Sequence, residues 1–234
     1  MELLRLAGPR PRAALFDFNG TISLDEPILD RLFREAFAGI GIELTSEEYY
    51  AELSGLSDPE IVVRALELHG RTAEPDLCER LLRAKIDRYK EVVLQEPTVP
   101  PDVLAFVRAV AERVPVAIGS GAVREEIVHV LEQHGLRDLF GVLVCIDDVE
   151  RGKPDPETYL RCLAALRRER PELGPEDCVV LEDSRFGIAA AHAAGMRCVA
   201  VHTSGELVGL AAADLVVQGL TGELAFGLFG TEGA

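Results

Sequence analysis

The chain has 234 residues, enough for one large domain or for a domain that carries an insertion. Its formal net charge of −16 argues against a nucleic-acid partner and disfavours binding to an anionic membrane surface. The five cysteines lack metal-site spacing, and the chain shows neither a membrane-spanning run nor a signal-peptide pattern, which together predict a cytoplasmic protein. Nothing in the sequence indicates an oligomer, so a monomer is the default expectation.

Strand and helix signals follow one another in an order typical of an interrupted α/β protein. A short apolar run at 13–18 predicts a buried parallel strand. Residues 24–97 then show helical periodicity and no strand signal, so we predict an all-helical cap domain there. The expected helices lie near 27–40, 46–53, 58–69 and 75–92. The core domain is predicted to comprise residues 1–23 and 98–234.

From residue 98 onward, strands and helices alternate. The expected strands are 114–119, 142–146, 178–182, 198–202 and 214–217, with helices at 102–112, 123–134, 156–169 and 185–194. Such alternation predicts a Rossmann-like parallel sheet covered by helices on both faces. The tail from Thr221 contains several glycines and is predicted to be poorly ordered at its end.

Asp17 stands at the carboxyl end of the first strand, and Gly20 allows the chain to turn sharply there. Ligand crevices of open α/β sheets lie just outside such strand ends. Asp17 is therefore a candidate nucleophile or metal ligand. For this stretch alone, an aspartate that merely starts a turn is the better interpretation.

Three later strand ends carry polar groups that favour the functional interpretation. Ser120 and Gly121 precede a helix, where a hydroxyl and free N–H groups can hold a phosphate oxygen, although in isolation an ordinary N-cap serine is the better interpretation. Gly152 and two prolines make the backbone around Lys153 rigid, which suggests an aimed ammonium instead of a solvated one. Glu182-Asp183 places two carboxylates together, and Mg²⁺ would neutralise them.

These four motifs resemble, in order and spacing, those of the haloacid dehalogenase-like superfamily, in particular its members with an inserted helical cap. Residues 17–21 are similar to the first motif of that family, Ser120 to the second and Lys153 to the third. The stretch 182–188 looks like the fourth motif. The resemblance covers nearly the whole chain.

The resemblance implies a phosphatase of a small phosphorylated metabolite. Asp17 would attack phosphorus, form an aspartyl-phosphate and also bind Mg²⁺. Asp183, assisted by Glu182, would hold the metal. The phosphoryl group would be bound by Ser120, Gly121, Thr21 and Lys153.

Asn19 departs from the family pattern, which has an acid/base aspartate two residues after the nucleophile. Its backbone carbonyl can still bind Mg²⁺, but its amide cannot transfer a proton, which predicts a deficit of about 10²–10⁴-fold. Another residue would then have to transfer the proton, and the carboxylates of Asp25 and Glu26 are nearby in sequence. The alternative is a catalytically weak homologue that binds a phosphorylated ligand as a sensor or partner protein. A sugar-phosphate mutase is disfavoured because residues 54–58 carry no basic side chain.

Overall fold

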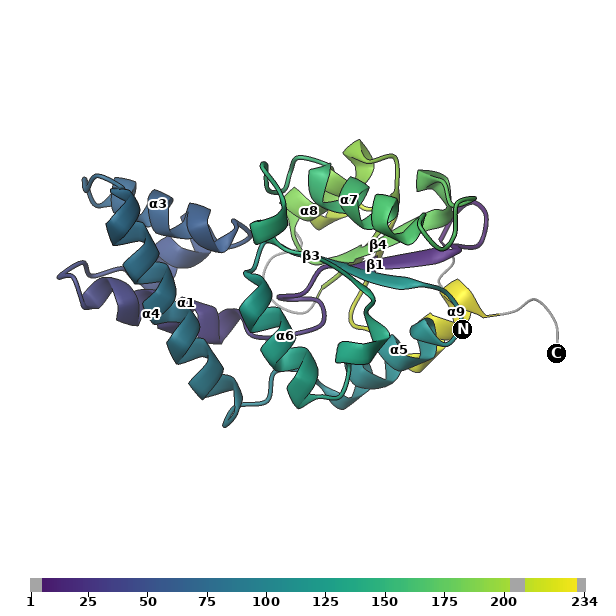
Figure 1. The fold of residues 1–234 in the computed structure, drawn as a ribbon, viewed down its shortest axis with the longest axis horizontal. Coiled ribbons are helices and arrows are strands. Elements are labelled where there is room, and N and C mark those ends of the chain that lie inside the picture. Colours follow the sequence, from purple (N-terminus) through teal and green to yellow (C-terminus); the bar gives the residue numbers. More distant parts are fainter. Residues whose placement is uncertain (1–5, 203–208, 231–234) are drawn as a thin grey trace.

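The computed structural model describes residues 6–202 and 209–230, in which helices surround one sheet (Figure 1). The strands are β1 (Ala13–Phe16), β2 (Val116–Gly119), β3 (Val142–Val144), β4 (Cys178–Glu182), β5 (Arg197–Val201) and β6 (Leu215–Val217). All neighbours are parallel, and their order is β3-β2-β1-β4-β5-β6. The predicted Rossmann-like α/β sheet is confirmed.

Helices cover both faces of this sheet. They are α5 (Pro101–Ala111), α6 (Arg124–Gln133), α7 (Glu157–Leu166), α8 (Arg185–Ala193) and α9 (Gly222–Phe229). Single 3₁₀ turns lie at Arg137–Leu139, Ile146–Asp148, Pro175–Asp177 and Leu210–Ala212. Alternate side chains of β1 enter two apolar clusters, Ala14 and Phe16 on the side of α5, α6 and α9, and Ala13 and Leu15 on the side of α7 and α8 (Figure 1). A strand buried on both faces has to be apolar throughout, as β1 is.

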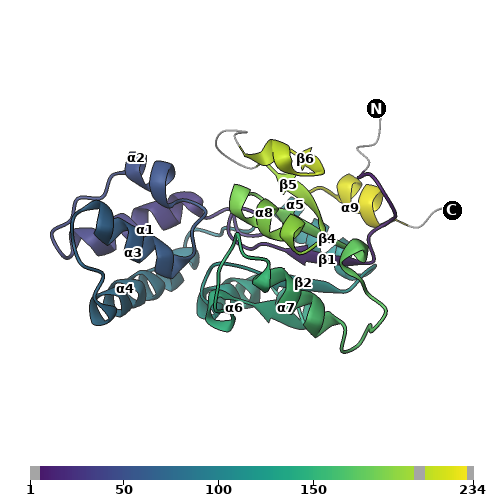
Figure 2. The same ribbon diagram turned by 90° about the horizontal axis from the view of Figure 1, so that it is seen from above.

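Residues 24–97 form helices and turns without a strand. The helices are α1 (Glu26–Ala38), α2 (Ser46–Glu48), a π-helical turn (Tyr49–Leu53), α3 (Asp58–Leu68) and α4 (Pro75–Val93). Capping boxes at Thr45–Glu48 and Ser57–Glu60 open α2 and α3. Figure 2 shows these helices gathered beside the sheet and its own helices. The domain bounds at residues 24 and 97 stay a prediction.

The segment after Thr221 contains a helix that the sequence analysis did not predict. The Thr221 hydroxyl accepts a hydrogen bond from the Leu224 backbone N–H at 3.3 Å and opens α9. Leu224 and Leu228 are buried in the same apolar cluster as α5, so tertiary packing stabilises a helix that its glycines disfavour. Residues 231–234, the far end of this tail, lie outside the described residues.

The described helices include none that is both long and apolar enough to cross a membrane. All five cysteines are free thiols, and four of them are buried.

Lys85 of α4 is a buried lysine that joins three helices. Its Nζ donates to Asp58 Oδ1 of α3 at 3.0 Å and to Glu126 Oε2 of α6 at 2.7 Å. The lysine side chain is 0% exposed, and the two carboxylates are 6% and 1% exposed. Two buried carboxylates therefore share one ammonium where α3 and α4 contact α6, a helix that covers the sheet.

We expect the free energy of unfolding to fall with rising pH, in part through Glu126. Burial, ahead of the opposing attraction of Lys85, raises the pKa of Glu126 from 4.5 to about 8. The folded state therefore keeps a proton that the unfolded chain releases above about pH 4.5. This contribution is complete below that pH and is lost as the pH rises through about 8. Glu126→Gln should flatten the pH dependence of urea unfolding between about pH 5 and pH 9.

Glu125→Gln is the matched control for this measurement. Glu125 is the adjacent residue, and hydrogen bonds from Arg83 and Lys90 lower its pKa to about 2. Its contribution is lost only in acid, so this variant should keep the wild-type pH dependence in the neutral range. Equal dependence for all three proteins would contradict the role of Glu126.

Candidate active site

The predicted site residues stand at one edge of the sheet. β1 lies between β2 and β4, where the strand order reverses. Phe16 at the end of β1 is paired with Ile118 of β2 and with Leu181 of β4. Asp17 and Ser120 therefore leave neighbouring strands at the same edge, the usual position of a ligand crevice in an open α/β sheet.

Lys153 reaches this edge from the loop before α7. Its Nζ donates to Asp17 Oδ1 at 2.5 Å and to Glu182 Oε1 at 2.6 Å. It also lies 5.0 Å from the ring centroid of Tyr159. The side chain is only 8% exposed, so Lys153 is an aimed ammonium and not a solvated loop lysine.

Glu182 is held by hydrogen bonds on both of its oxygens. Besides Lys153, the Tyr159 hydroxyl donates to Oε1 at 2.9 Å. Oε2 accepts from the backbone N–H groups of Asp183 and Ser184 at 3.0 and 2.9 Å, and from the Ser184 hydroxyl at 2.9 Å. This carboxylate is thus fixed in orientation and holds Lys153 in turn.

Asp183 is the most exposed of the three carboxylates at this edge of the sheet. Oxygens of Asp17, Glu182 and Asp183 lie within 4.8 Å of one another. A Cβ on Gly20, whose φ is +77°, would overlap Asp183 Oδ2. Glycine at this position therefore allows the loop after β1 to approach Asp183 closely.

Three carboxylates face one ammonium here, and their pKa values differ accordingly. Burial, opposed by Lys153, raises the pKa of Asp17 to about 7. Burial and the charges of Glu182 and Asp17 raise the pKa of Asp183 well above its usual range. Glu182 loses solvation too, but Lys153 and the hydrogen bonds to Glu182 lower its pKa. The cluster has an excess of negative charge that suits a bound cation.

The predicted phosphate-binding residues have different surroundings. The Ser120 hydroxyl accepts from the Ala122 N–H at 3.1 Å, which leaves its own proton available for donation. Gly121 lies against the loop before α3, and its carbonyl accepts from the Asp58 N–H at 3.3 Å. Thr21 is fully buried, and its Oγ1 has no partner among the described residues.

Three further residues contact the site in ways that the sequence analysis did not predict. Tyr159 and Ser184 donate to Glu182, and Asp25 accepts from Asn19. Ser184 belongs to the fourth motif, so its adjacency was the one available signal. Tyr159 carries no such signal, because its contact depends on tertiary packing, and Asp25 had only its nearness to Asn19 in the sequence.

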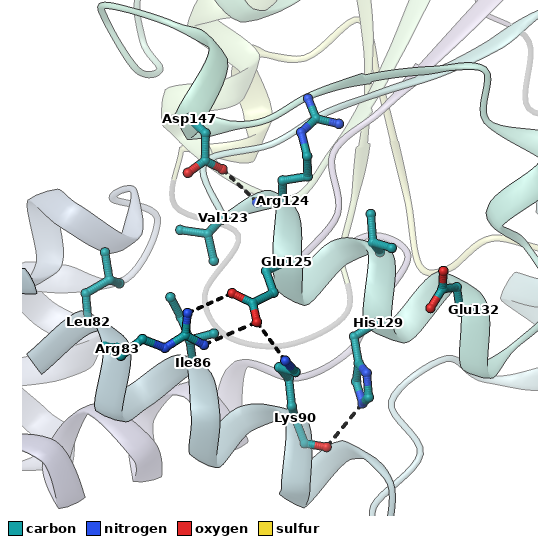
Figure 3. Close-up of a pocket in the computed structure, with 11 residues that line it drawn as sticks. Leu82, Arg83, Ile86, Lys90, Val123, Arg124, Glu125, His129, Glu132 and Asp147 are labelled. Atoms are coloured by element: carbon teal, nitrogen blue, oxygen red, sulfur yellow. Dashed lines mark hydrogen bonds and ion pairs between the residues drawn. The ribbon is translucent and has the colours of Figure 1, made fainter. Parts of the chain in front are cut away.

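A separate groove of about 680 Å³ lies between α4 and α6 (Figure 3). Arg83 and Lys90 of α4 both bind Glu125 of α6, at 2.8 and 2.7 Å. The His129 ring contacts the Lys90 carbonyl at 3.2 Å. None of the predicted site residues lines this groove, and these charges are paired with each other, so we assign the site to the sheet edge.

Comparison with known proteins agrees with this geometry. Residues 11–195 match the family model described as haloacid dehalogenase-like hydrolase. The chain is 32% identical over 187 residues to the fructose-1-phosphate phosphatase YqaB of Escherichia coli strain K12, covering 80% of this chain and 94% of that protein. It is 30% identical to a phosphorylated carbohydrates phosphatase of Thermotoga maritima, covering 79% and 82%.

A solved structure of a similar protein has the same fold. CbbY from Rhodobacter sphaeroides, crystallised in complex with phosphate, superposes with a TM-score of 0.76 at 26% identity. The match covers 93% of this chain and 96% of that one. The motifs at 17–21, 120, 153 and 182–188 lie within the matched region, and the sheet edge gathers three of them by direct contacts. The chain belongs to the haloacid dehalogenase-like hydrolase family.

Proposed function

We propose that this hydrolase is a Mg²⁺-dependent phosphatase that acts through Asp17 on a small phosphorylated metabolite. The observation that carries the proposal is the contact of Lys153 with both Asp17 and Glu182 beside Asp183. Phosphoryl transfer needs positioning and charge neutralisation more than other catalytic devices, and this cluster supplies both.

Asp17 is proposed as the nucleophile. Lys153 binds its Oδ1, so Oδ2 is the oxygen that attacks phosphorus. A P–O bond forms to Asp17 while the P–O bond to the leaving group breaks, and water then hydrolyses the aspartyl-phosphate. Lys153 and the Ser120 hydroxyl bind phosphoryl oxygens in this scheme. For Gly121 and Thr21, contact with the phosphoryl group stays a prediction.

The carboxylates at the sheet edge suit a hard divalent cation. Asp17 and Asp183 offer oxygen ligands close together, and burial together with the charges of Glu182 and Asp17 raises the pKa of Asp183. When bound, Mg²⁺ would neutralise the negative charge of the phosphoryl oxygens. We assign Asp17, Asp183 and the Asn19 backbone carbonyl as its ligands. Glu182, which already accepts hydrogen bonds on both oxygens, instead anchors Lys153.

The relatives support a phosphorylated carbohydrate as the substrate, since two of them are named for phosphatases of such compounds. The free cysteines support a reducing compartment such as the cytoplasm. Because Asn19 cannot transfer a proton to the leaving group, we expect esters with good leaving groups to react about 10²–10⁴-fold faster than alkyl esters.

Hydrolysis of p-nitrophenyl phosphate, followed by a panel of sugar monophosphates, tests this proposal. Turnover with Mg²⁺ that stops on chelation is the expected result. Tight binding of phosphate esters without turnover of any of them would instead support the sensor or partner protein that Asn19 also suggests.

Gly20→Ala should remove the effect of Mg²⁺ on stability. A ligand that binds only the folded state stabilises it by about 2.7 kcal/mol at 100 times its Kd. The Cβ that this substitution adds would displace Asp183, so we expect the Mg²⁺-dependent rise in Tm to disappear. Gly41→Ala is the matched control, because Gly41 also has a φ of +77° but nothing lies within 4 Å of its Cβ position. A full Mg²⁺ shift in Gly20→Ala would contradict the assignment of Asp183.

A further inference from the structure

Asp25 is a fully buried carboxylate on which three hydrogen-bond donors converge. Asn19 Nδ2 donates to its Oδ2 at 2.9 Å, and the Ser23 hydroxyl donates to the same oxygen at 2.8 Å. The Tyr89 hydroxyl is the third donor to this oxygen. The amide of Asn19 thus presents its nitrogen to Asp25.

The donors come from different parts of the chain. Tyr89 belongs to α4, within the helical stretch at 24–97. The Ser23 hydroxyl also contacts Thr98 Oγ1 at 2.7 Å, on the segment that returns to the sheet, and Leu24 N–H donates to the Thr98 carbonyl at 2.8 Å. Asp25 thus connects the loop after β1 with α4 and with both segments that join the helices at 24–97 to the sheet.

We propose that Asp25 is the positioning residue for Asn19, and that the two side chains act as a pair in which position 19 holds the amide and position 25 holds the carboxylate. The catalytic consequence rests on the proposed function above. With its nitrogen bound to Asp25, the Asn19 amide has its oxygen left to accept a hydrogen bond from the attacking water or from a leaving-group hydroxyl. Asn19 therefore orients a proton-bearing group without taking its proton.

The contact between residues 19 and 25 predicts how the protein responds to an aspartate at position 19. The carboxylate introduced by Asn19→Asp would meet Asp25 at hydrogen-bond distance, in a site from which water is excluded on the Asp25 side. Two carboxylates so close repel each other. Asp25→Asn in the same chain would restore a donor. The amide introduced at position 25 can donate one N–H to the new carboxylate at position 19 and the other to the Tyr89 hydroxyl, while the Ser23 hydroxyl keeps its contact with Thr98 Oγ1.

Four proteins test the proposal: wild type, Asn19→Asp, Asp25→Asn and the exchanged double variant. We expect Asn19→Asp to lower Tm and the double variant to recover most of that loss, so that the two effects are not additive. With Mg²⁺ and the phosphate ester of a simple alcohol, kcat of the double variant should exceed that of Asn19→Asp by about 10-fold or more, with KM little changed.

Asp30→Asn combined with Asn19→Asp is the matched control. Asp30 is another buried carboxylate of α1, but its partners are Arg34 and Ser46, so its neutralisation should rescue neither Tm nor kcat. Additive changes in Tm, or a full gain in kcat from Asn19→Asp alone, would overturn the pair. If every variant lacks hydrolytic activity while the Tm coupling persists, the phosphatase proposal fails and the contact between residues 19 and 25 stands.

Discussion

Asp17→Asn is expected to abolish hydrolysis of p-nitrophenyl phosphate while the protein stays folded. An amide is not a nucleophile towards phosphorus, and loss of a nucleophile can cost about 10⁶-fold in kcat, so we expect a loss of at least about 10⁴-fold. The fold should tolerate the change, because burial already raises the pKa of Asp17 to about 7 and the amide oxygen can still accept from Lys153.

Steady-state kinetics and rapid quenching check this expectation. Wild type should accumulate phosphate on the protein during turnover, and Asp17→Asn should accumulate none. Asp147→Asn serves as the control, because Asp147 is a carboxylate in the α4–α6 groove that accepts from the Arg124 N–H at 2.8 Å. Turnover by Asp17→Asn within about tenfold of wild type would mean that another group attacks phosphorus.

Lys153→Met is expected to reduce both stability and activity. The side chains of Lys153, Asp17 and Glu182 are 8%, 9% and 1% exposed, so removing the cation leaves buried carboxylates uncompensated. Loss of one partner from a buried ion pair costs about 3–5 kcal/mol. Loss of a donor to the phosphoryl oxygens should lower kcat by a further factor of about 10²–10³.

Urea unfolding and kinetics on the same preparation separate the two effects. Lys90→Met is the matched control, because Lys90 donates to Glu125 at 2.7 Å but is 33% exposed in the groove of Figure 3. A pair of that kind contributes about 0–1 kcal/mol. Mg²⁺ should recover part of the stability lost in Lys153→Met. Equal unfolding free energies for both variants would show that Lys153 does not stabilise the fold more than a surface lysine does.

The order of elements could be predicted because local signals mark them. The apolar run before Asp17 predicts a strand buried on both faces, and the capping boxes at Thr45 and Ser57 mark the starts of α2 and α3. α9 was missed because its glycines lower helix propensity, and its apolar side chains gain their stability only when they pack beside α5.

The candidate site was predictable to the extent that parallel strands end at one edge. Asp17, Ser120 and Glu182 follow strands, so their gathering follows from topology. Lys153 was a weaker inference, since loop lysines are usually solvated, and its two contacts bridge 136 and 29 residues along the chain. Asn19 could be recognised as a departure and Asp25 as a neighbour in sequence, but the hydrogen bond between their side chains could not be predicted.

The sequence by itself determined the alternation of strands and helices, the helical stretch at 24–97 and the acidic and basic groups at the strand ends. These features depend on residues close together in the chain, where spacing and capping are readable. Only the tertiary structure decided that Tyr89 and Ser23 converge with Asn19 on Asp25, and that Lys85 is buried between two carboxylates. Such contacts join residues up to 64 positions apart, and burial, which no local pattern encodes, decides which polar groups must pair.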